Sequence, residues 1–296
     1  MKTPIRYAGG KSKAYSVITE QLLKFSRPKR IISPFMGGGS LESRWSSELR
    51  VKVIGYDIFD ALVNFWQVLL TNPRELSDEL HTLSPTKEKY TEVKEWLLEW
   101  DYTQTMLKDW HTDYYKREAK SLSPLKAAAY YYFNHNLSYG PMYLGWISKI
   151  YEDPAKWSKM VCQVKNYRNP NLSVEKGDFQ EVIAQHKNDF LYLDPPYLLG
   201  AGGNNKMFKG VYPNANIDVH HSGFDHEALK RLLHNHEGGF ILSYNDCDHI
   251  REAYSEFEQI FPKWHYSYAL GETRIGKNKK NNDPKKSHEI LIVKRK

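Results

Sequence analysis

The chain has 296 residues, a formal net charge of +7 at pH 7 and two cysteines. This length can bury a substantial core in one large domain or two smaller ones. No apolar run approaches the roughly 20 residues of a membrane-spanning helix, and residues 1–6 lack the apolar core of a signal peptide. Cys162 and Cys247 have no metal-ligand spacing. We therefore expect a soluble enzyme from a reducing compartment, whose charge favours an anionic partner.

Short apolar segments alternate with helical patterns in residues 1–61 and 171–296, which we expect to form one domain. The expected strands are 30–33, 51–56, 172–175, 190–193, 240–243, 264–268 and 289–293, and residues 225–234 are an example of an expected helix. This alternation predicts an α/β fold with a doubly wound, mostly parallel sheet. Residues 62–170 differ, because their helical periodicity, clear in 91–100, predicts a mainly helical insertion.

A glycine-rich turn follows the first expected strand. Residues 34–40 read Pro-Phe-Met-Gly-Gly-Gly-Ser, and glycines let a backbone approach a ligand closely. About twenty residues later the second expected strand ends in Tyr56-Asp57, where a carboxylate can accept hydrogen bonds from ribose hydroxyls. The two features together predict a site for a nucleoside-containing cofactor. A tight turn with a helix cap is the alternative.

Two shorter motifs extend this predicted cofactor site. Residues 7–11 read Tyr-Ala-Gly-Gly-Lys, in which Lys11 can neutralise a carboxylate and Tyr7 can pack on an adenine or a sulfonium. Asp178 follows the third expected strand and can accept a hydrogen bond from an adenine amino group, with Phe179 packed nearby. The alternative is that Lys11 and Asp178 are surface charges.

The run Asp194-Pro195-Pro196-Tyr197 follows the apolar segment 189–193. Prolines cannot donate to a sheet ladder, so the run should lie at the carboxyl end of a strand, where open α/β sheets bind ligands. The Asp194 carboxylate and the Pro195 carbonyl can grip an exocyclic amine, and Tyr197 can stack on the ring that carries it. The alternative is a rigid loop with an aspartate cap.

These motifs, in this order, resemble the Dam-type (D12 class, alpha group) DNA adenine-N6 methyltransferases over nearly the whole chain. The resemblance implies a class I, Rossmann-like, S-adenosylmethionine-dependent methyltransferase fold, with target recognition in residues 62–170. It implies that Asp194, Pro195, Pro196 and Tyr197 are catalytic. The cofactor-binding residues that it implies are Tyr7, Gly9, Gly10, Lys11, Phe35, Gly37, Gly38, Gly39, Ser40, Asp57, Asp178, Phe179 and Asp194.

The implied reaction is site-specific transfer of a methyl group from S-adenosylmethionine to the N6 amine of an adenine in duplex DNA. Hydrogen bonds to Asp194 and Pro195 would localise the lone pair of that amine, and the base must be flipped out of the helix. Asp194 must be ionised, so we expect no strongly raised pKa in the bound state. The alternatives are a cytosine-N4 or RNA adenine methyltransferase, and a DNA-binding module without catalysis.

Residues 132–140 resemble the family's recognition stretch only loosely, with departures at His135 and Leu137. The candidates for contact with bases or phosphates are Asn134, Asn136, Tyr139, Lys149, Arg168, Lys279 and Lys280. No histidine spacing predicts a metal. The expected partners are double-stranded DNA and a cognate restriction endonuclease. We expect a monomer or weak dimer in the cytoplasm of a bacterium, or in the host cytosol of a phage or virus.

Overall fold

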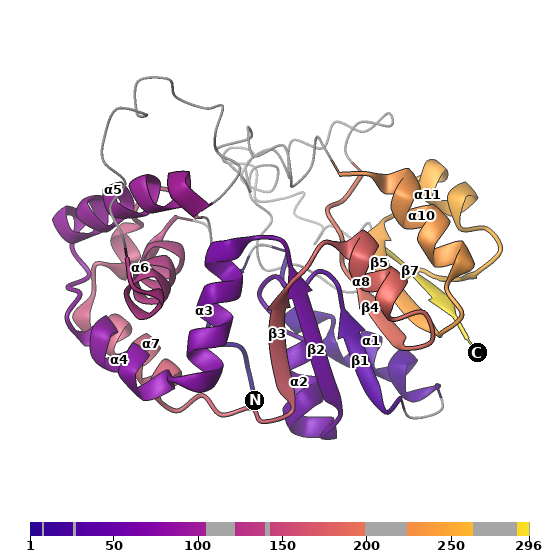
Figure 1. Cartoon of the computed structure of the whole chain (residues 1–296), viewed down its shortest axis with the longest axis horizontal. Helices are drawn as coiled ribbons and strands as arrows, with labels where there is room; N and C mark the ends of the chain where they lie inside the picture. The colour runs from indigo at the N-terminus through magenta and orange to yellow at the C-terminus, as the bar shows by residue number, and fades with distance from the viewer. Residues whose placement is uncertain are drawn as a thin grey trace, which may run out of the picture. The chain divides into compact units, whose positions relative to one another are not determined.

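The computed structural model describes residues 1–7, 9–25, 28–104, 122–139, 143–198, 224–262 and 289–295. Its described strands form a seven-stranded sheet in the order β3-β2-β1-β4-β5-β7-β6 (Figure 1). The strands are β1 (Arg30–Ser33), β2 (Lys52–Asp57), β3 (Leu172–Lys176), β4 (Phe190–Leu193), β5 (Phe240–Asn245), β6 (Glu258–Ile260) and β7 (Glu289–Lys294).

The sheet is mostly parallel, as the sequence predicts. β1 pairs in parallel with β2 and with β4, and β4 pairs in parallel with β5. β7 is antiparallel to both β5 and β6. The sequence-based strands at 30–33 and 190–193 agree with β1 and β4 residue for residue. The three-residue β6 was not predicted, because it is too short and too exposed for an apolar pattern, and the strand expected at 264–268 lies outside the described residues.

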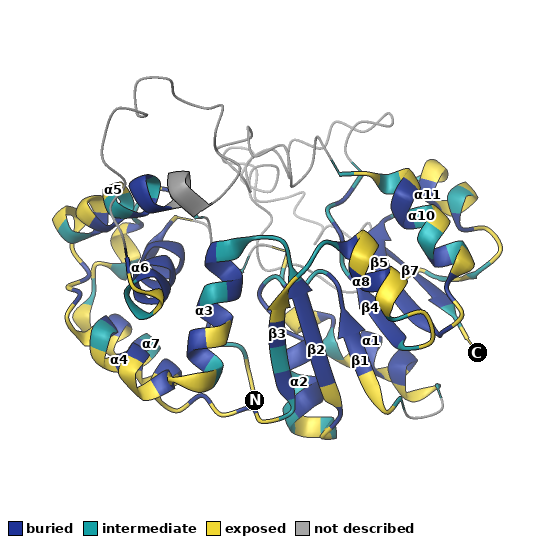
Figure 2. Ribbon diagram, in the orientation of Figure 1, coloured by how far each residue is buried: buried dark blue, intermediate teal, exposed yellow. Residues whose placement is uncertain are grey.

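The direction of winding reverses between β1 and β4. The chain passes from β1 to β2 on one side, whereas β4 and β5 continue the sheet on the other side of β1. Open α/β sheets bind ligands outside the carboxyl ends of their strands at such a switch point. β4 and β5 are buried along their whole length (Figure 2). The residue that follows β4 is therefore held on a rigid support.

The chain divides into two compact units. The first consists of residues 1–10, 37–50 and 57–176, and the second of residues 11–36, 51–56 and 177–296. The helical insertion expected at 62–170 falls within the first unit. The domain boundaries expected from the sequence stay a prediction.

The second unit contains most of the sheet and, among its described residues, five short helical segments. These are η1 (Lys11–Lys13), α1 (Tyr15–Leu23), α8 (Phe179–Gln185), α10 (His226–Asn235) and α11 (Asp248–Ala253). Asp225 caps α10 by accepting a hydrogen bond from the Ala228 backbone N–H. Leu229 and Leu233, one helical turn apart, bury one face of α10 in the core that contains β4 and β5.

The first unit is mainly helical. Where the structure describes it, its helical segments are α2 (Glu42–Arg44), the π-helical turn η2 (Trp45–Leu49), α3 (Asp60–Thr71), α4 (Pro73–His81), α5 (Lys87–Gln104), α6 (Pro124–Leu137), η5 (Lys149–Tyr151) and α7 (Pro154–Lys165). α6 packs against α3, α4 and α5, and every residue from 127 to 137 is buried. Burial on all faces makes α6 the central helix of this unit.

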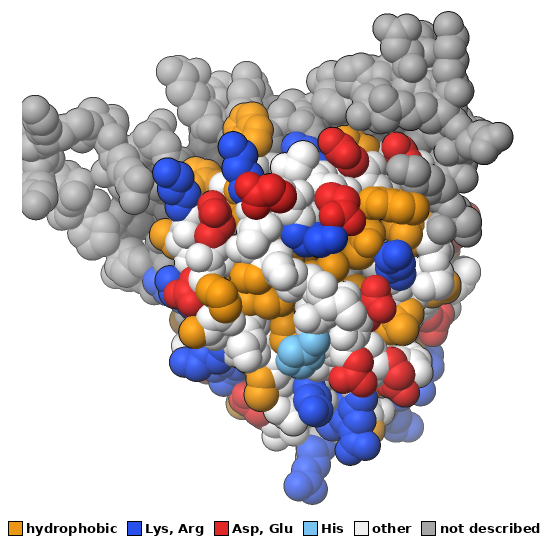
Figure 3. All heavy atoms as spheres, turned by 90° about the vertical axis from the view of Figure 1, so that its left-hand side faces the viewer, with side chains coloured by type: hydrophobic (Ala, Val, Ile, Leu, Met, Phe, Trp, Pro, Cys, Tyr) orange, Lys and Arg blue, Asp and Glu red, His pale blue; other side chains and the backbone are white. Residues whose placement is uncertain are grey.

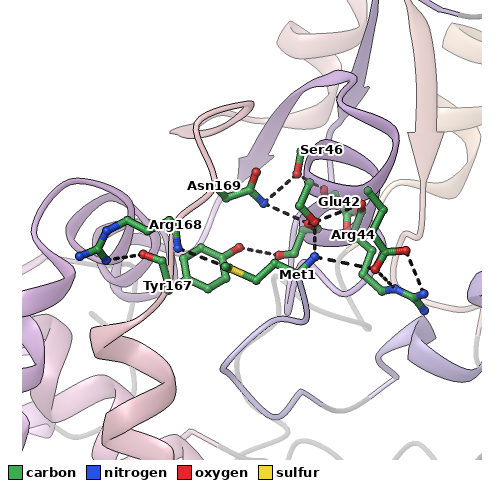
Figure 4. Close-up of polar contacts among 10 residues, drawn as sticks. Met1, Glu42, Arg44, Ser46, Tyr167, Arg168 and Asn169 are labelled. Carbon is green, nitrogen blue, oxygen red and sulfur yellow. Dashed lines mark hydrogen bonds and ion pairs between the residues drawn. The ribbon is translucent and has the colours of Figure 1, made fainter.

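Polar contacts join the α2–η2 segment to the chain just before β3 (Figure 4). The Asn169 side-chain N–H group donates to the Ser43 carbonyl (3.0 Å) and to the Ser46 hydroxyl (2.8 Å). The hydroxyls of Ser43 and Tyr167 are 2.8 Å apart. These groups are buried, so each contact satisfies polar atoms that cannot reach water.

We predict that Asn169→Ala destabilises the protein by about 1–3 kcal/mol, because it removes a buried donor that serves both the Ser43 carbonyl and the Ser46 hydroxyl. Urea unfolding measures the change. Asn166→Ala is the matched control, since Asn166 is exposed and donates to the Cys162 carbonyl of the preceding turn. An equal loss in the two variants would contradict this account of the cluster.

Candidate active site

A buried ion pair holds the carboxylate that follows β4. The Nζ of Lys11 lies 2.7 Å from each carboxylate oxygen of Asp194. The Lys11 side chain is 3% exposed and that of Asp194 is 22% exposed. Lys11 was expected to face a carboxylate, and in the structure it faces a carboxylate of the protein itself. Pro195 is buried and Pro196 is half-buried, so the backbone next to Asp194 is also fixed.

Burial raises the pKa of Asp194 to about 6; the Lys11 ammonium lowers that pKa and the Glu289 carboxylate raises it. Asp194 is therefore mostly ionised at pH 7 and becomes protonated as the pH falls through about 6. The expectation of a pKa that is not strongly raised concerns the bound state and stays a prediction. In the structure the shift is upward because the carboxylate is desolvated.

Glu289, at the start of β7, is part of this cluster. Its Oε1 accepts a hydrogen bond from the Tyr197 hydroxyl (2.5 Å) and lies 3.8 Å from Lys11 Nζ. Lys11 Nζ also lies 5.2 Å from the centre of the Tyr197 ring. Sequence reasoning placed Glu289 only as the first residue of a strand. An acidic residue opening an otherwise apolar strand is the signal that could have found it.

The neighbouring strand β5 holds the end of the motif. The Leu198 backbone N–H donates to the side-chain oxygen of Asn245 (2.9 Å), and the Asn245 side-chain N–H group donates back to the Leu198 carbonyl (3.2 Å). The ring of Tyr197 stacks with that of Tyr244, with centroids 6.1 Å apart. Tyr197 is itself buried, so its ring and hydroxyl both have fixed positions.

An aromatic group in the second unit contains two residues that the sequence singled out. The rings of Phe35, Phe179 and Phe224 lie within 5.0 to 5.7 Å of one another. Phe224 was not predicted, because an isolated phenylalanine carries no motif. Asp178 caps α8 by accepting a hydrogen bond from the Gln180 backbone N–H (2.8 Å) and remains half-buried. Phe179 is buried and the other two rings are half-buried, and such rings beside a carboxylate fit a purine with an exocyclic amine.

The glycine-rich turn lies in the first unit, where it packs against Tyr7. Gly37 and Gly39 have positive φ angles of 45° and 56°. A Cβ atom on Gly38 would lie 2.3 Å from the Cβ of Tyr7. The turn therefore requires glycine for its backbone conformation and for close contact with Tyr7. Ser40, at the end of the turn, is buried.

Asp57 fixes the same turn. Its Oδ2 accepts a hydrogen bond from the Gly37 backbone N–H (2.9 Å) and its Oδ1 accepts one from the Phe59 backbone N–H (3.0 Å). Burial raises the pKa of Asp57, and the backbone N–H groups oppose that rise. A carboxylate offers about four lone-pair sites, and Asp57 is only half-buried. It therefore fits a ribose that donates two hydroxyls.

The turn that precedes Lys11 in sequence is open. Gly9 has a φ of +74°, and a Cβ atom added there would meet nothing within 4 Å. The Gly10 backbone N–H donates to the Tyr7 carbonyl (3.2 Å). Glycine is therefore favoured at position 9 by the backbone conformation and not by close packing.

Asn134 and Asn136 do not match the expectation that they face DNA. Both are completely buried on α6. The side-chain oxygen of Asn134 accepts from the Leu144 backbone N–H (2.7 Å), and that of Asn136 accepts from the Arg6 backbone N–H (2.9 Å). Their amides anchor loops to the central helix, which corrects the prediction that they contact bases.

The other candidates for DNA contact are exposed where the structure describes them. Tyr139 is 52% exposed, and Lys149 and Arg168 are exposed. The guanidinium of Arg168 donates to the carbonyls of Lys165 and Tyr167. Trp146, whose carbonyl accepts from the Tyr139 backbone N–H, is 71% exposed and was not predicted. Lys279 and Lys280 lie outside the described residues.

Figure 3 shows a face of the mainly helical unit on which basic and acidic side chains are interspersed. In the same unit, Lys89 pairs with Glu92 on α5, and Lys156 pairs with Asp153 at the start of α7. Mixed charge is typical of a solvated surface rather than of a phosphate-binding one. This face therefore adds no support for a DNA-binding surface.

Among the described residues, no group of three or more histidine, cysteine, aspartate or glutamate side chains is placed to hold a metal ion. No helix in the described parts of the chain is long and apolar enough to cross a membrane.

The sheet is mostly parallel and doubly wound, and the Asp194 motif follows a parallel strand at its switch point, an arrangement consistent with the class I, Rossmann-like methyltransferase fold. Residues 7–268 match the model of the D12 class N6 adenine-specific DNA methyltransferase family. The chain belongs to this family, and its activity is adenine-N6 methylation of DNA. The comparison with curated proteins gives no match.

We predict that Lys11→Met moves the acid limb of the pH–rate profile upward by roughly one to three units, because an opposite charge at this distance lowers a carboxylate pKa by that much. Wild-type activity should fall as the pH drops through about 6, and the variant should already be impaired at pH 7. Lys13→Met, an exposed lysine of the same short helix, is the control. An unshifted limb in Lys11→Met would refute the pairing.

Proposed function

We propose that the chain methylates the N6 amine of adenines at specific sites in duplex DNA, with S-adenosylmethionine as the methyl donor and Asp194 as the central catalytic residue. The observation that carries this proposal is the half-buried carboxylate held by Lys11 at the carboxyl end of β4. The adenine specificity follows from the family.

Asp194 and Pro195 act on the target amine. The lone pair of an adenine N6 is delocalised into the ring, so the amine is a weak nucleophile. Two hydrogen bonds, to the Asp194 carboxylate and to the Pro195 carbonyl, favour a tetrahedral nitrogen with a localised lone pair. A carboxylate whose pKa is about 6 is a better acceptor than an ordinary aspartate and is still ionised at pH 7. Tyr197 and Pro196 complete the rigid wall against which the base is placed.

Both units carry residues that fit the donor. In the second unit Phe35, Phe179 and Phe224 suit an adenine ring, and Asp178 suits its amino group. In the first unit Asp57 suits the ribose hydroxyls, and Tyr7 and the open turn at Gly9 suit the remaining part of S-adenosylmethionine. S-adenosylmethionine supplies an electrophilic methyl group on a sulfonium. Gly10, Gly37, Gly38, Gly39 and Ser40 shape the backbone around these groups, and Lys11 places its charge beside Asp194.

The DNA partner is double-stranded, and the target base is flipped out of the helix, because a stacked adenine cannot reach a carboxylate at a strand end. Exposed Tyr139, Lys149 and Arg168 remain the described candidates for contact with DNA, and Lys279 and Lys280 remain candidates from the sequence. A cognate restriction endonuclease, a monomeric or weakly dimeric state and a cytoplasmic location are further inferences from the family resemblance.

We predict that Asp194→Asn abolishes methyl transfer with little loss of fold. The change removes the negative acceptor but keeps the side-chain volume. Unmethylated phage DNA is incubated with the protein and S-adenosylmethionine, and its nucleosides are then analysed by mass spectrometry. Wild-type protein should produce N6-methyladenine.

Asp246→Asn is the control for that experiment. Asp246 directly follows β5, the strand next to β4, and pairs with Arg251. Its replacement should leave the rate within a few-fold of wild type. Activity of Asp194→Asn close to that of wild type would overturn the mechanism. N4-methylcytosine in place of N6-methyladenine, or methylation of RNA alone, would overturn the choice of substrate.

We predict that Asp57→Ala weakens S-adenosylmethionine binding by roughly ten- to a hundredfold, the loss expected for a hydrogen-bonded charged acceptor. Calorimetric titration without DNA measures this affinity. Asp60→Ala is the control, because Asp60 lies one turn away and pairs with Lys176. Equal affinity in the wild type and Asp57→Ala would remove Asp57 from the cofactor site.

A further inference from the structure

Glu289 is a second buried carboxylate beside the catalytic one. The Glu289 side chain is 5% exposed. Glu289 is the first residue of β7, and its backbone pairs with that of Asn245 on β5. Burying a carboxylate is costly unless charge or hydrogen bonds compensate it. Here the Tyr197 hydroxyl, the Lys11 ammonium and the Ser243 hydroxyl (3.4 Å) supply that compensation.

We propose that Glu289 is a positioning residue for methyl transfer, which holds the Tyr197 ring through its hydroxyl and shares the Lys11 ammonium with Asp194. The assignment deepens the proposed function and rests on it. In this role Glu289 does not touch the target base, and it acts through Tyr197 and Lys11.

The geometry supports both actions of Glu289. The Tyr197 hydroxyl bonds Glu289 at the far end of the ring from the backbone, so the ring is fixed at both ends. Tyr244 stacks with the same ring, and Asn245 binds the backbone of the next residue, Leu198. Lys11 lies 2.7 Å from Asp194 and 3.8 Å from Glu289. One cation therefore serves two carboxylates, and Asp194 has the shorter contact.

This sharing has a consequence for pH. Asp194 is faced by Lys11 from η1 and by Glu289 from β7, with the Tyr197 ring next to Lys11. The two charges act on Asp194 in opposite directions, because Lys11 favours its ionised form and Glu289 opposes it. Neutralising Glu289 should extend activity to lower pH, whereas neutralising Lys11 should restrict it to higher pH.

The test is the pH–rate profile of Glu289→Gln on unmethylated phage DNA with saturating S-adenosylmethionine. Glutamine keeps an oxygen for the Tyr197 hydroxyl and removes the charge. The acid limb should move down by on the order of one pH unit, as expected when a like charge leaves a shared site. Glu258→Gln on β6 is the matched control, because the same change is made on a strand paired with β7, at an exposed residue that binds Arg295. Its profile should coincide with that of the wild type.

Two further variants separate the charge from the hydrogen bond. Glu289→Asp keeps the charge, but its side chain is one methylene shorter and no longer reaches the Tyr197 hydroxyl. We therefore expect kcat to fall while the acid limb of the pH–rate profile does not move down. Tyr197→Phe removes the hydroxyl and should lower kcat in the same way, again without a downward shift. If Glu289→Gln does not fold, these two variants decide the proposal, and a kcat unchanged in both would overturn it.

The outcomes distinguish this proposal from the proposed function. If wild-type protein forms no N6-methyladenine, the proposed function fails. If wild-type protein forms it and the acid limb of a folded Glu289→Gln coincides with that of the wild type, or moves upward, the positioning assignment fails while the function stands.

Discussion

The buried ion pair between Lys11 and Asp194 is the interaction on which the proposed chemistry depends. A carboxylate taken out of water at the end of β4 would become neutral near pH 7 without a cation, and a neutral acid accepts hydrogen bonds poorly. With Lys11 at 2.7 Å the pKa stays at about 6. Two elements of the second unit position the pair: Asp194 directly follows β4, and Lys11 is the first residue of η1. The pair joins residues that are 183 positions apart in the chain.

The sheet gives the pair its rigidity. Asp194 follows a strand that is buried throughout and lies between two parallel neighbours, β1 and β5. The β5 side chain of Asn245 then binds the backbone of Leu198, so the motif is held at both of its ends. A carboxylate directly after a buried strand keeps its orientation better than one on a free loop.

Much of this fold was predictable from the sequence, because buried parallel strands appear as short apolar runs. The positions of β1 and β4, and the place of Asp194 after β4, follow from such runs. The partners of Asp194 did not follow, since Lys11 and Glu289 lie in distant segments that only the folded sheet brings together. Asn134 and Asn136 were misjudged for a related reason. Polar residues on a helix suggest an exposed face, but α6 is enclosed by α3, α4 and α5, and the amides bind backbone groups instead.

The position of Glu289 bears on how the protein acquires activity during its synthesis. Lys11 and Asp194 precede β7 in the chain and leave the ribosome before it does, so a nascent chain can form their ion pair without the Glu289 carboxylate. The Tyr197 hydroxyl cannot donate to Glu289 until β7 pairs with β5. In such a chain the motif would have its charge pair, and the Tyr197 ring could stack on Tyr244, but its hydroxyl would lack the contact with Glu289. The pairing of β7 with β5 is then also the step that brings Glu289 to the Tyr197 hydroxyl.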